Sequence, residues 1–238
     1  MNTIFLDFDG VLFDTLKEAY LLCRYSFSNI EVFEPIKQDE YTMFYKYKFL
    51  VYNSWQYYYL MKLLSQKTPE SEFVNAYNDL LNTRDKIAEE NFDKKYYEKR
   101  AKLKSENFEF WNKLEEPFEF FFEVKHLFEK SKYDIVIVSK KDFQSIKMRL
   151  NQYGLNLPDE KIFDKQKLEK YPEKSDFIME YMNKNSVQRA SFVDDNSNNL
   201  RPCEDIPNLR CLLAGWGNIA VDEVGLSCSD VINEIRIL

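Results

Sequence analysis

Two aspartates stand two positions apart within residues 4–13, where a short apolar run gives way to a glycine. Side chains alternate along a strand, so Asp7 and Asp9 would share one face if the strand continued, and Gly10 would let the backbone turn sharply. Two carboxylates in one small volume repel each other, which raises a pKa unless a cation lies between them. The spacing therefore indicates a shared proton or a bound hard metal ion. The simpler alternative is an acidic turn after an edge strand.

Apolar runs separated by helical patterns predict the framework that would position these acids. Residues 133–138, 190–193 and 209–213 are aliphatic or β-branched and are followed by polar residues or glycine, as buried strands are. Between them, one predicted helix ends at Gly154 and another begins near Ser175. Strands that alternate with helices predict an α/β fold with a mostly parallel sheet.

Polar residues follow the predicted strands, at the edge where parallel sheets bind their ligands. Ser139 follows one strand, Asp194 and Asp195 follow another, and Lys174 precedes the helix near Ser175. Together with the first two acids, these side chains form a set that suits phosphoryl transfer.

Each member of this set has a plausible chemical role. A carboxylate such as Asp7 can attack phosphorus and form an aspartyl-phosphate, and Asp9 can act as general acid and base. Ser139 can hold phosphate oxygens, and the Lys174 ammonium can offset negative charge. Asp195, Asp7 and the backbone carbonyl of Asp9 offer the hard oxygen ligands that Mg²⁺ prefers.

The composition indicates a folded, histidine-poor protein. Its 238 residues are 45% apolar and 31% charged, with 20 Phe and 16 Tyr, which is enough for one large or two modest domains with an aromatic-rich core. The net charge of −7 argues against a nucleic-acid partner. His126 is the only histidine, so mechanisms that need a histidine triad or a two-histidine metal site are excluded.

Cysteine usage and hydropathy favour a cytoplasmic location. The four cysteines lack CxxC spacing and are too few for a disulfide framework in a chain of this length, so we expect reduced thiols, mostly buried. No signal segment is recognisable at the amino terminus, and no apolar run is long enough to cross a bilayer. We therefore expect no membrane partner.

Residues 16–116 differ from the rest of the chain, with helical periodicity and almost no strand pattern. We interpret them as an inserted helical domain. Thr68 and Pro69 are typical of a helix start. The mixed-charge run 84–104 indicates a solvated helix face, and the aromatic residues within 41–59 favour the core of a helical bundle over a ligand pocket.

In this order, the motifs resemble those of the haloacid dehalogenase-like superfamily of phosphohydrolases. The matching segments are Asp-Phe-Asp-Gly-Val-Leu-Phe-Asp-Thr at 7–15, Ser139, Lys174, and Phe-Val-Asp-Asp-Asn at 192–196. The resemblance implies a Rossmann-like core, residues 1–15 and 117–238, with a helical cap domain, residues 16–116, inserted between the first two motifs. It also implies Mg²⁺ dependence and an aspartyl-phosphate intermediate.

The resemblance also sorts the remaining candidates. Asn199 stands where many members of the superfamily carry a further acid, so Asp195 is assigned to the metal, and Asp194 and Asn199 to supporting roles. Gly10 and Lys140 join the phosphate-binding set, although Lys140 could instead face solvent, as could its neighbour Lys141. Three other lysines compete with Lys174 for the third motif: Lys165, Lys167 and Lys170.

The leading hypothesis is a Mg²⁺-dependent hydrolase of a small soluble phosphate monoester, such as a sugar, polyol or amino-alcohol phosphate. A phosphomutase of the same fold is the alternative, since it uses the same two acids. Asp9 disfavours a dehalogenase or a phosphonate hydrolase, because those relatives lack this acid. A non-catalytic protein that binds a phosphate ligand is the hypothesis from another class, and the clustered carboxylates argue against it.

Overall fold

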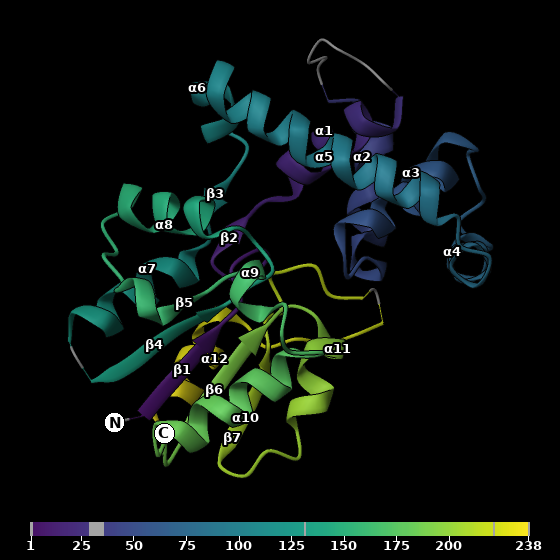
Figure 1. Cartoon of the computed structure of the whole chain (residues 1–238). Helices are drawn as coiled ribbons and strands as arrows, with labels where there is room; N and C mark the ends of the chain where they lie inside the picture. Colours follow the sequence, from purple (N-terminus) through teal and green to yellow (C-terminus); the bar gives the residue numbers. More distant parts are fainter. Residues whose placement is uncertain (1, 29–35, 131, 221, 238) are drawn as a thin grey trace. The chain divides into compact units, whose positions relative to one another are not determined.

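A parallel sheet of five strands forms the centre of one of two units in the chain (Figure 1). The computed structural model describes residues 2–28, 36–130, 132–220 and 222–237. The strand order is β5-β4-β1-β6-β7, and neighbouring strands are parallel throughout. The strands are β1 (Asn2–Leu6), β4 (Tyr133–Val138), β5 (Ile162–Phe163), β6 (Ala190–Asp194) and β7 (Leu209–Leu213).

The sheet confirms the predicted α/β class and its Rossmann-like, parallel arrangement. Strands β4 and β7 have the predicted bounds, and β6 continues one residue further, to Asp194. The edge strand β5 was not predicted, because a strand of two residues gives no alternating pattern.

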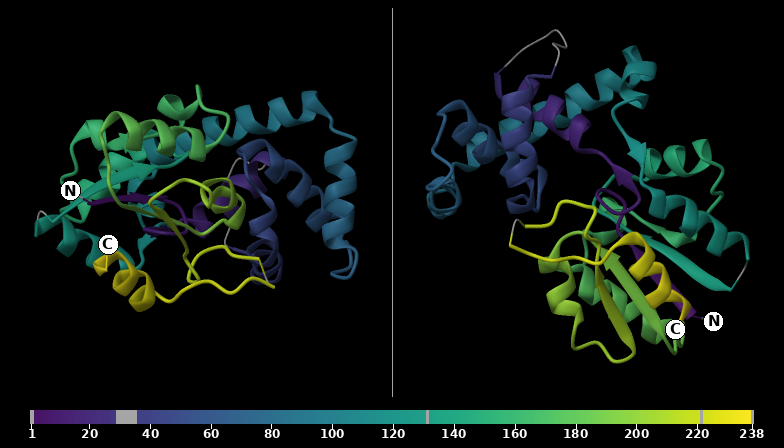
Figure 2. Two further views of the ribbon diagram at one scale, coloured as in Figure 1. Left: turned by 90° about the horizontal axis from the view of Figure 1, so that it is seen from below. Right: turned by 180° about the vertical axis from the view of Figure 1, so that it is seen from behind.

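Alternating side chains of β1 enter two separate hydrophobic cores. Ile4 and Leu6 belong to one core and Phe5 to the other, and all three are completely buried. The first core includes residues of α7 (Glu119–Glu129), α8 (Phe143–Gln152) and α12 (Cys228–Arg236). The second includes residues of α9 (Lys165–Leu168), α10 (Lys174–Lys184) and α11 (Ser197–Leu200). Helices therefore cover both faces, as parallel sheets require (Figures 1 and 2).

Capping residues determine where the helices next to the candidate site residues begin and end. The Asp142 carboxylate accepts a hydrogen bond from the Ser145 N–H (2.9 Å) and begins α8. Gly154, with φ of +76°, follows its end. A capping box at Glu173 begins α10 one residue before its predicted start. Two single-turn 3₁₀-helices, η3 (Asp159–Lys161) and η4 (Arg201–Cys203), lie in the connections.

The chain makes a tight turn directly after β1. The Phe8 carbonyl accepts hydrogen bonds from the N–H groups of Leu12 (3.0 Å) and Phe13 (3.1 Å), and the rings of Phe8 and Phe13 stack at 4.8 Å. The turn leads into β2 (Phe13–Asp14), which pairs antiparallel with β3 (Glu116–Pro117). Two strands far apart in the sequence therefore form one small hairpin-like ladder.

The second unit, Thr15–Glu115, is helical, and the first consists of Met1–Asp14 with Glu116–Leu238. The α-helices of the second unit are α1 (Leu16–Ser28), α2 (Gln38–Tyr47), α3 (Tyr57–Ser65), α4 (Phe73–Asn82), α5 (Lys86–Glu106) and α6 (Phe108–Asn112). Two 3₁₀-helices, η1 (Lys48–Leu50) and η2 (Ser54–Gln56), connect α2 to α3. No helix among the described residues is long and apolar enough to span a membrane.

Aromatic rings fill the interior of the second unit. Phe44 stacks on Tyr57 at 5.6 Å, Tyr47 stacks on Phe73 at 4.0 Å, and all four side chains are buried. Tyr45 is an exception, with 54% of its surface exposed. The expectation that this aromatic stretch packs a helical core is confirmed.

The predicted helix start at Thr68 and Pro69 is wrong. Helix α4 begins at Phe73, and Pro69 opens a preceding turn in which its carbonyl accepts from the Glu72 N–H (3.0 Å). The Thr68 N–H instead donates to the carbonyl of Leu63 (3.1 Å) and closes the end of α3. Thr68 therefore belongs to the end of α3, and Pro69 belongs to the turn that follows it.

A buried ion cluster joins three parts of the second unit. The Arg100 guanidinium on α5 contacts the Glu18 carboxylate on α1 at 2.8 Å and the Glu115 carboxylate at 3.7 Å. The Trp111 indole N–H also donates to Glu18. The side chains of Glu18, Arg100 and Glu115 are 3%, 9% and 0% exposed. Burial lowers the pKa of Arg100, but the two carboxylates outweigh burial and raise it.

Candidate active site

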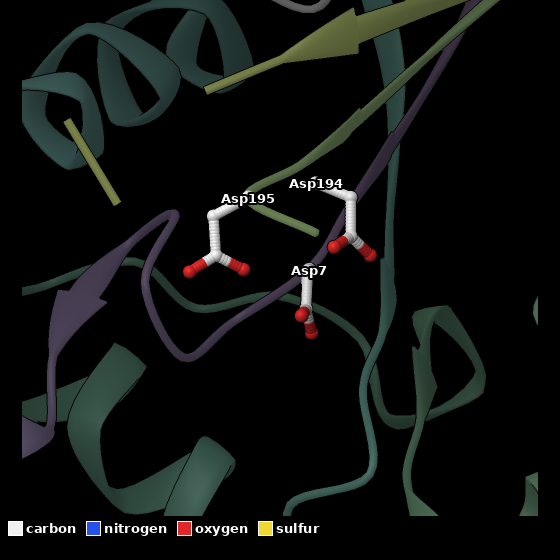
Figure 3. Close-up of side chains that lie close together, drawn as sticks. All are labelled: Asp7, Asp194 and Asp195. Atoms are coloured by element: carbon white, nitrogen blue, oxygen red, sulfur yellow. The ribbon is translucent and has the colours of Figure 1, made fainter. Parts of the chain in front are cut away.

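Two adjacent strand ends bring three carboxylates together at one edge of the parallel sheet. Asp7 follows β1, Asp194 ends β6 and Asp195 comes next, and the Asp7 N–H donates to the Val193 carbonyl of β6 (2.9 Å). Oxygen atoms of the three carboxylates lie within 4.8 Å of one another. Figure 3 shows their carboxyl groups extending into a common space. Asp7, Asp194 and Asp195 are 9%, 0% and 6% exposed.

The Lys174 ammonium is in contact with this cluster. Its Nζ lies 2.8 Å from Asp194 Oδ2 and 3.1 Å from Asp7 Oδ2, and only 4% of the side chain is exposed. Burial lowers the pKa of Lys174, but Asp194 and Asp7 outweigh it and raise the pKa. The competing Lys167 donates to the carbonyls of Asp159 (2.9 Å) and Ile162 (2.7 Å), so the structure brings Lys174 to the acids.

Asp194 is saturated by protein donors. Besides Lys174, it accepts hydrogen bonds from the Asn196 N–H (2.9 Å) and from the Asn199 amide, which lies 3.1 Å from both of its oxygens. Asn196 also caps α11, which carries Asn199. Asp194 therefore contacts Lys174, and Asn199 contacts Asp194; the supporting roles expected of the two residues stay a prediction.

Asp195 is held by a loop that follows β7. Its Oδ2 accepts hydrogen bonds from the Asn218 backbone N–H (2.8 Å) and the Asn218 side-chain amide (2.9 Å). Gly217 lies against Asp195 so closely that a Cβ there would overlap its side chain. Neither Asn218 nor Gly217 could be identified from a sequence pattern, because the contact depends on where a distant loop returns to the sheet edge.

Gly10 completes the tight packing around Asp195. Its φ is +82°, and a Cβ at this position would overlap Asp195 Oδ2, so only glycine fits. The Gly10 N–H donates to the Phe13 carbonyl (2.8 Å). The role that the structure gives Gly10 is therefore conformational, and its expected contact with phosphate stays a prediction.

Asp9 stands apart from the three clustered carboxylates and pairs with a different lysine. Asp9 Oδ1 lies 2.9 Å from Lys141 Nζ, with the Lys141 side chain 2% exposed and that of Asp9 39% exposed. Lys140, which the sequence analysis assigned to phosphate, is exposed. The sequence pattern could not show which of these two adjacent lysines contacts Asp9, because both lie in the loop after the strand, where no helical or strand periodicity applies.

Ser139 lies at the end of β4, beside β1. Its N–H donates to the Phe163 carbonyl of β5 (3.0 Å), and its hydroxyl oxygen accepts from the Lys141 N–H (3.4 Å). Ser139 is 2% exposed. The β4 loop therefore places a hydroxyl and the Lys141 ammonium at the same edge of the sheet as Asp7.

The electrostatics of Asp7 indicate a site for a cation. Burial is the largest effect and raises the pKa of Asp7, the Lys174 ammonium opposes it, and Asp194, Asp195 and Asp9 raise it further, to about 7. A divalent cation would reverse this shift. Buried carboxylate oxygens are the hard ligands that suit Mg²⁺, so the donor set fits such an ion. Asp7 and Asp195 would hold it, with the expected Asp9 carbonyl.

The fold has close counterparts among solved structures. One is a predicted phosphoglycolate phosphatase from Haemophilus somnus 129PT, 12% identical over 99% of this chain and 98% of that chain, with a TM-score of 0.64. Another is a haloacid dehalogenase-like family hydrolase from Streptococcus pneumoniae, 13% identical over 99% and 98%, with a TM-score of 0.60. A third is a candidate β-phosphoglucomutase from Thermotoga maritima, 14% identical over 100% of both chains, with a TM-score of 0.52.

The chain has the haloacid dehalogenase-like fold. This fold agrees with the one that the resemblance implied from four short motifs. No protein-family model and no curated protein sequence matches the chain. At 11–15% identity the likeness concerns the fold, and the activity has to be argued from the site.

Proposed function

We propose that this protein is a Mg²⁺-dependent phosphomonoester hydrolase that acts on a small phosphate ester through an aspartyl-phosphate. The observation that carries the proposal is the convergence of Asp7, Lys174 and Asp195 at the carboxyl edge of a parallel sheet. The haloacid dehalogenase-like fold supports it, because phosphatases and hydrolases are among the named structures with this fold.

Asp7 is the proposed nucleophile. One carboxylate oxygen attacks phosphorus, the bond to the ester oxygen breaks, and the phosphoryl group is transferred to the aspartate. Lys174, 3.1 Å from Asp7, offsets the charge that builds up on the nucleophile and the phosphoryl oxygens. Attack requires the ionised carboxylate, which a pKa of about 7 leaves only partly populated at neutral pH in the absence of a cation.

Asp9 is the proposed general acid and base. It donates a proton to the departing ester oxygen and then takes one from the water that attacks the aspartyl-phosphate, which releases inorganic phosphate and restores Asp7. The buried ammonium of Lys141, 2.9 Å from Asp9 Oδ1, holds the partly exposed carboxylate in one place. We therefore assign Lys141 as the positioning residue of Asp9.

Phosphate oxygens would contact the loop at the end of β4 and the cation. Ser139 supplies a hydroxyl, and Lys174 an ammonium; Lys140 and Gly10 remain secondary candidates. A Mg²⁺ ion held by Asp7, Asp195 and the Asp9 carbonyl would neutralise charge on the phosphoryl group. The two Asn218 donors orient Asp195 for that task.

The substrate class is a small ester, such as a sugar, polyol or amino-alcohol phosphate. The helical unit Thr15–Glu115 is inserted in the chain after Asp7 and Asp9 and before β4. We propose that it acts as a cap that excludes water and selects the leaving group, as inserted lids do.

The deciding experiment measures inorganic phosphate released from a panel of small phosphate esters, with Mg²⁺ and with a chelator. Asp7→Asn is the blank, because it removes the nucleophilic oxygen while keeping the side-chain shape. We expect Mg²⁺-dependent release from one or a few related esters and at least about a 10³-fold loss in Asp7→Asn. Thermal unfolding of the variant checks that the fold is intact.

The same panel separates the alternative functions. A phosphomutase would convert a sugar phosphate to its isomer with little phosphate release, so the products are also analysed by NMR. The fold of a candidate β-phosphoglucomutase makes this the main competitor. If neither phosphate nor an isomer forms above the level of the blank, although Mg²⁺ is bound, the result would favour a protein that only binds its phosphate ligand.

A further inference from the structure

The loop that follows β7, residues 214–218, is attached at both ends to β6 or to the residue after it. At its start, the Ala214 N–H donates to the last carbonyl of β6 (3.0 Å). At its end, Asn218 donates twice to Asp195 Oδ2. Between these points, the Gly217 N–H donates to the Ala214 carbonyl (3.2 Å) and closes the loop into a turn. The 214–218 loop is therefore held against the strand end that carries Asp195.

Trp216, in the middle of this loop, contacts the tight turn after β1. Its indole N–H donates to the Val11 carbonyl (3.0 Å). The Gly10 N–H donates to the Phe13 carbonyl (2.8 Å) and closes that turn around Val11. Because the turn is closed, its backbone groups shift together, and they include the carbonyl of Asp9, two residues before Val11.

The ring of Trp216 is itself held by packing. Its centroid lies 4.9 Å from that of Phe120, which is completely buried in the first core, and Trp216 is partly buried against the same core. Close packing of this kind restricts a side chain to one orientation. The indole N–H therefore stays directed at the Val11 carbonyl.

The loop and the turn also contact each other directly. A Cβ on Gly217 would overlap both the Gly10 carbonyl oxygen and the Asp195 side chain. A Cβ on Gly10 would come too close to Asp195 Oδ2 and to the Asn218 amide. Glycine at both positions allows these backbone segments to meet, and a shift of either segment would displace the Asp195 carboxylate.

We propose that Trp216 is a positioning residue for the Mg²⁺ site, because it holds the turn of Asp9 and the loop that orients Asp195 in one arrangement. The inference rests on the proposed function, which assigns the Asp9 carbonyl and the Asp195 carboxylate to Mg²⁺. This ion demands near-ideal octahedral geometry, and residues behind the ligands determine how well the ligands provide it. Trp216 acts through Val11 on one ligand and through Asn218 on the other.

The test measures Mg²⁺ binding to the metal-free, full-length protein by isothermal titration calorimetry. Trp216→Phe keeps an aromatic ring and removes the N–H donor, so the Mg²⁺ dissociation constant should rise by about tenfold. The control is Ile146→Val, which removes a methyl group from the same core. Ile146 lies on α8, which contacts β5, at the opposite edge of the sheet from β7.

The control separates positioning from general stability. Ile146→Val should lower the midpoint of thermal unfolding and change the Mg²⁺ dissociation constant by less than about twofold. An equal loss of Mg²⁺ affinity in Ile146→Val and Trp216→Phe would overturn the proposal, because it would show that any weakening of this core impairs the site.

A second variant tests whether Trp216 and Asn218 act through the same loop. Asn218→Ala removes the side-chain donor to Asp195 and should also raise the dissociation constant by about tenfold. The double variant Trp216→Phe with Asn218→Ala should lose less than the product of the two single losses, because each substitution releases the same loop. A fully multiplicative loss would overturn the proposal.

The same titrations distinguish this inference from the proposed function. Wild-type binding of Mg²⁺ with unchanged affinity in Trp216→Phe would overturn the role of Trp216 and leave the proposed metal site intact. A wild-type protein that binds no Mg²⁺ would overturn the metal site of the proposed function and this inference with it.

Discussion

At the scale of single residues, the site depends on carboxylates whose charges are compensated by specific partners. Lys174 contacts Asp7 and Asp194, Lys141 contacts Asp9, and Asn218 donates twice to Asp195. The pKa of Asp7 is nevertheless raised from 3.8 to about 7, chiefly by burial and further by the neighbouring carboxylates, although Lys174 opposes this rise.

Mg²⁺ binding should depend on pH through Asp7. Its raised pKa stabilises the metal-free protein fully below about pH 4, and this contribution is lost as pH rises through about 7. Because the ion displaces the proton, Mg²⁺ affinity should rise by about tenfold per pH unit up to about 7 and level off above it. Mg²⁺-induced shifts in the unfolding midpoint at pH 5.5 to 8.5 measure this.

Asp7→Asn provides the comparison, because an amide has no proton to exchange in this range. In that variant the Mg²⁺-induced shift should be smaller and nearly constant with pH. A wild-type shift that is equally constant would contradict the assignment of Asp7 as both a titrating group and a ligand.

Lys141 should matter far more than an exposed lysine outside the site. Lys141→Met removes the ammonium that holds Asp9 at 2.9 Å, so kcat should fall by about 10- to 100-fold with a small change in KM. The matched variant Lys132→Met changes an exposed lysine at the opposite end of β4 from Ser139 and should lose less than about threefold. Steady-state kinetics on the preferred ester, which separate kcat from KM, measure both variants.

Equal losses in the two lysine variants would show that Lys141 has no specific role, and a loss confined to KM would indicate that Lys141 binds the phosphate and does not position Asp9. Restoration of kcat by Lys141→Arg would agree with positioning by a cation, because the guanidinium can still pair with the carboxylate.

At the scale of elements, the sequence predicts the strands and the polar residues at their ends. Ser139 and Asp194 could be placed because each follows a continuous apolar run. Lys141 and Asn218 could not, because their partners are decided by loop conformations and by contacts across long stretches of chain. The predicted start of α4 was wrong for a similar reason, because the Thr68 N–H donates to the Leu63 carbonyl and closes the end of α3.

The buried ion cluster should dominate the stability of the helical unit. Arg100→Met removes the guanidinium that contacts the Glu18 and Glu115 carboxylates, 3% and 0% exposed, which should lower the free energy of unfolding by about 3–5 kcal/mol. Lys102→Met breaks a surface pair, 4.0 Å from Glu106 with both side chains more than half exposed, and should cost less than about 0.5 kcal/mol. Urea unfolding followed by tryptophan fluorescence compares them.

A similar small cost for both variants would mean that water reaches the Arg100 cluster. The double variant Arg100→Met with Glu18→Gln separates these cases, since removing the second charge should recover part of the loss only if the cluster is dry.

At the scale of the whole molecule, a sheet unit contains the candidate site, and a helical unit is inserted into its chain. If the helical unit acts as a cap, small esters should be hydrolysed with a kcat/KM about 100-fold or more above that for a phosphoserine peptide. Steady-state kinetics on glycerol phosphate, a hexose phosphate and such a peptide make the comparison. Comparable values for the peptide would argue against a cap that excludes bulky substrates.

The short ladder between β2 and β3 has an architectural consequence. Asp14, where the chain leaves the sheet unit, is paired with Glu116, where it returns. Along the chain, the whole helical unit therefore takes the place of a hairpin loop. It links two paired residues that a tight two-residue turn could also join. The molecule is open to modular exchange at this point, because a different insert grafted between the same two strands would leave the register of the sheet unchanged.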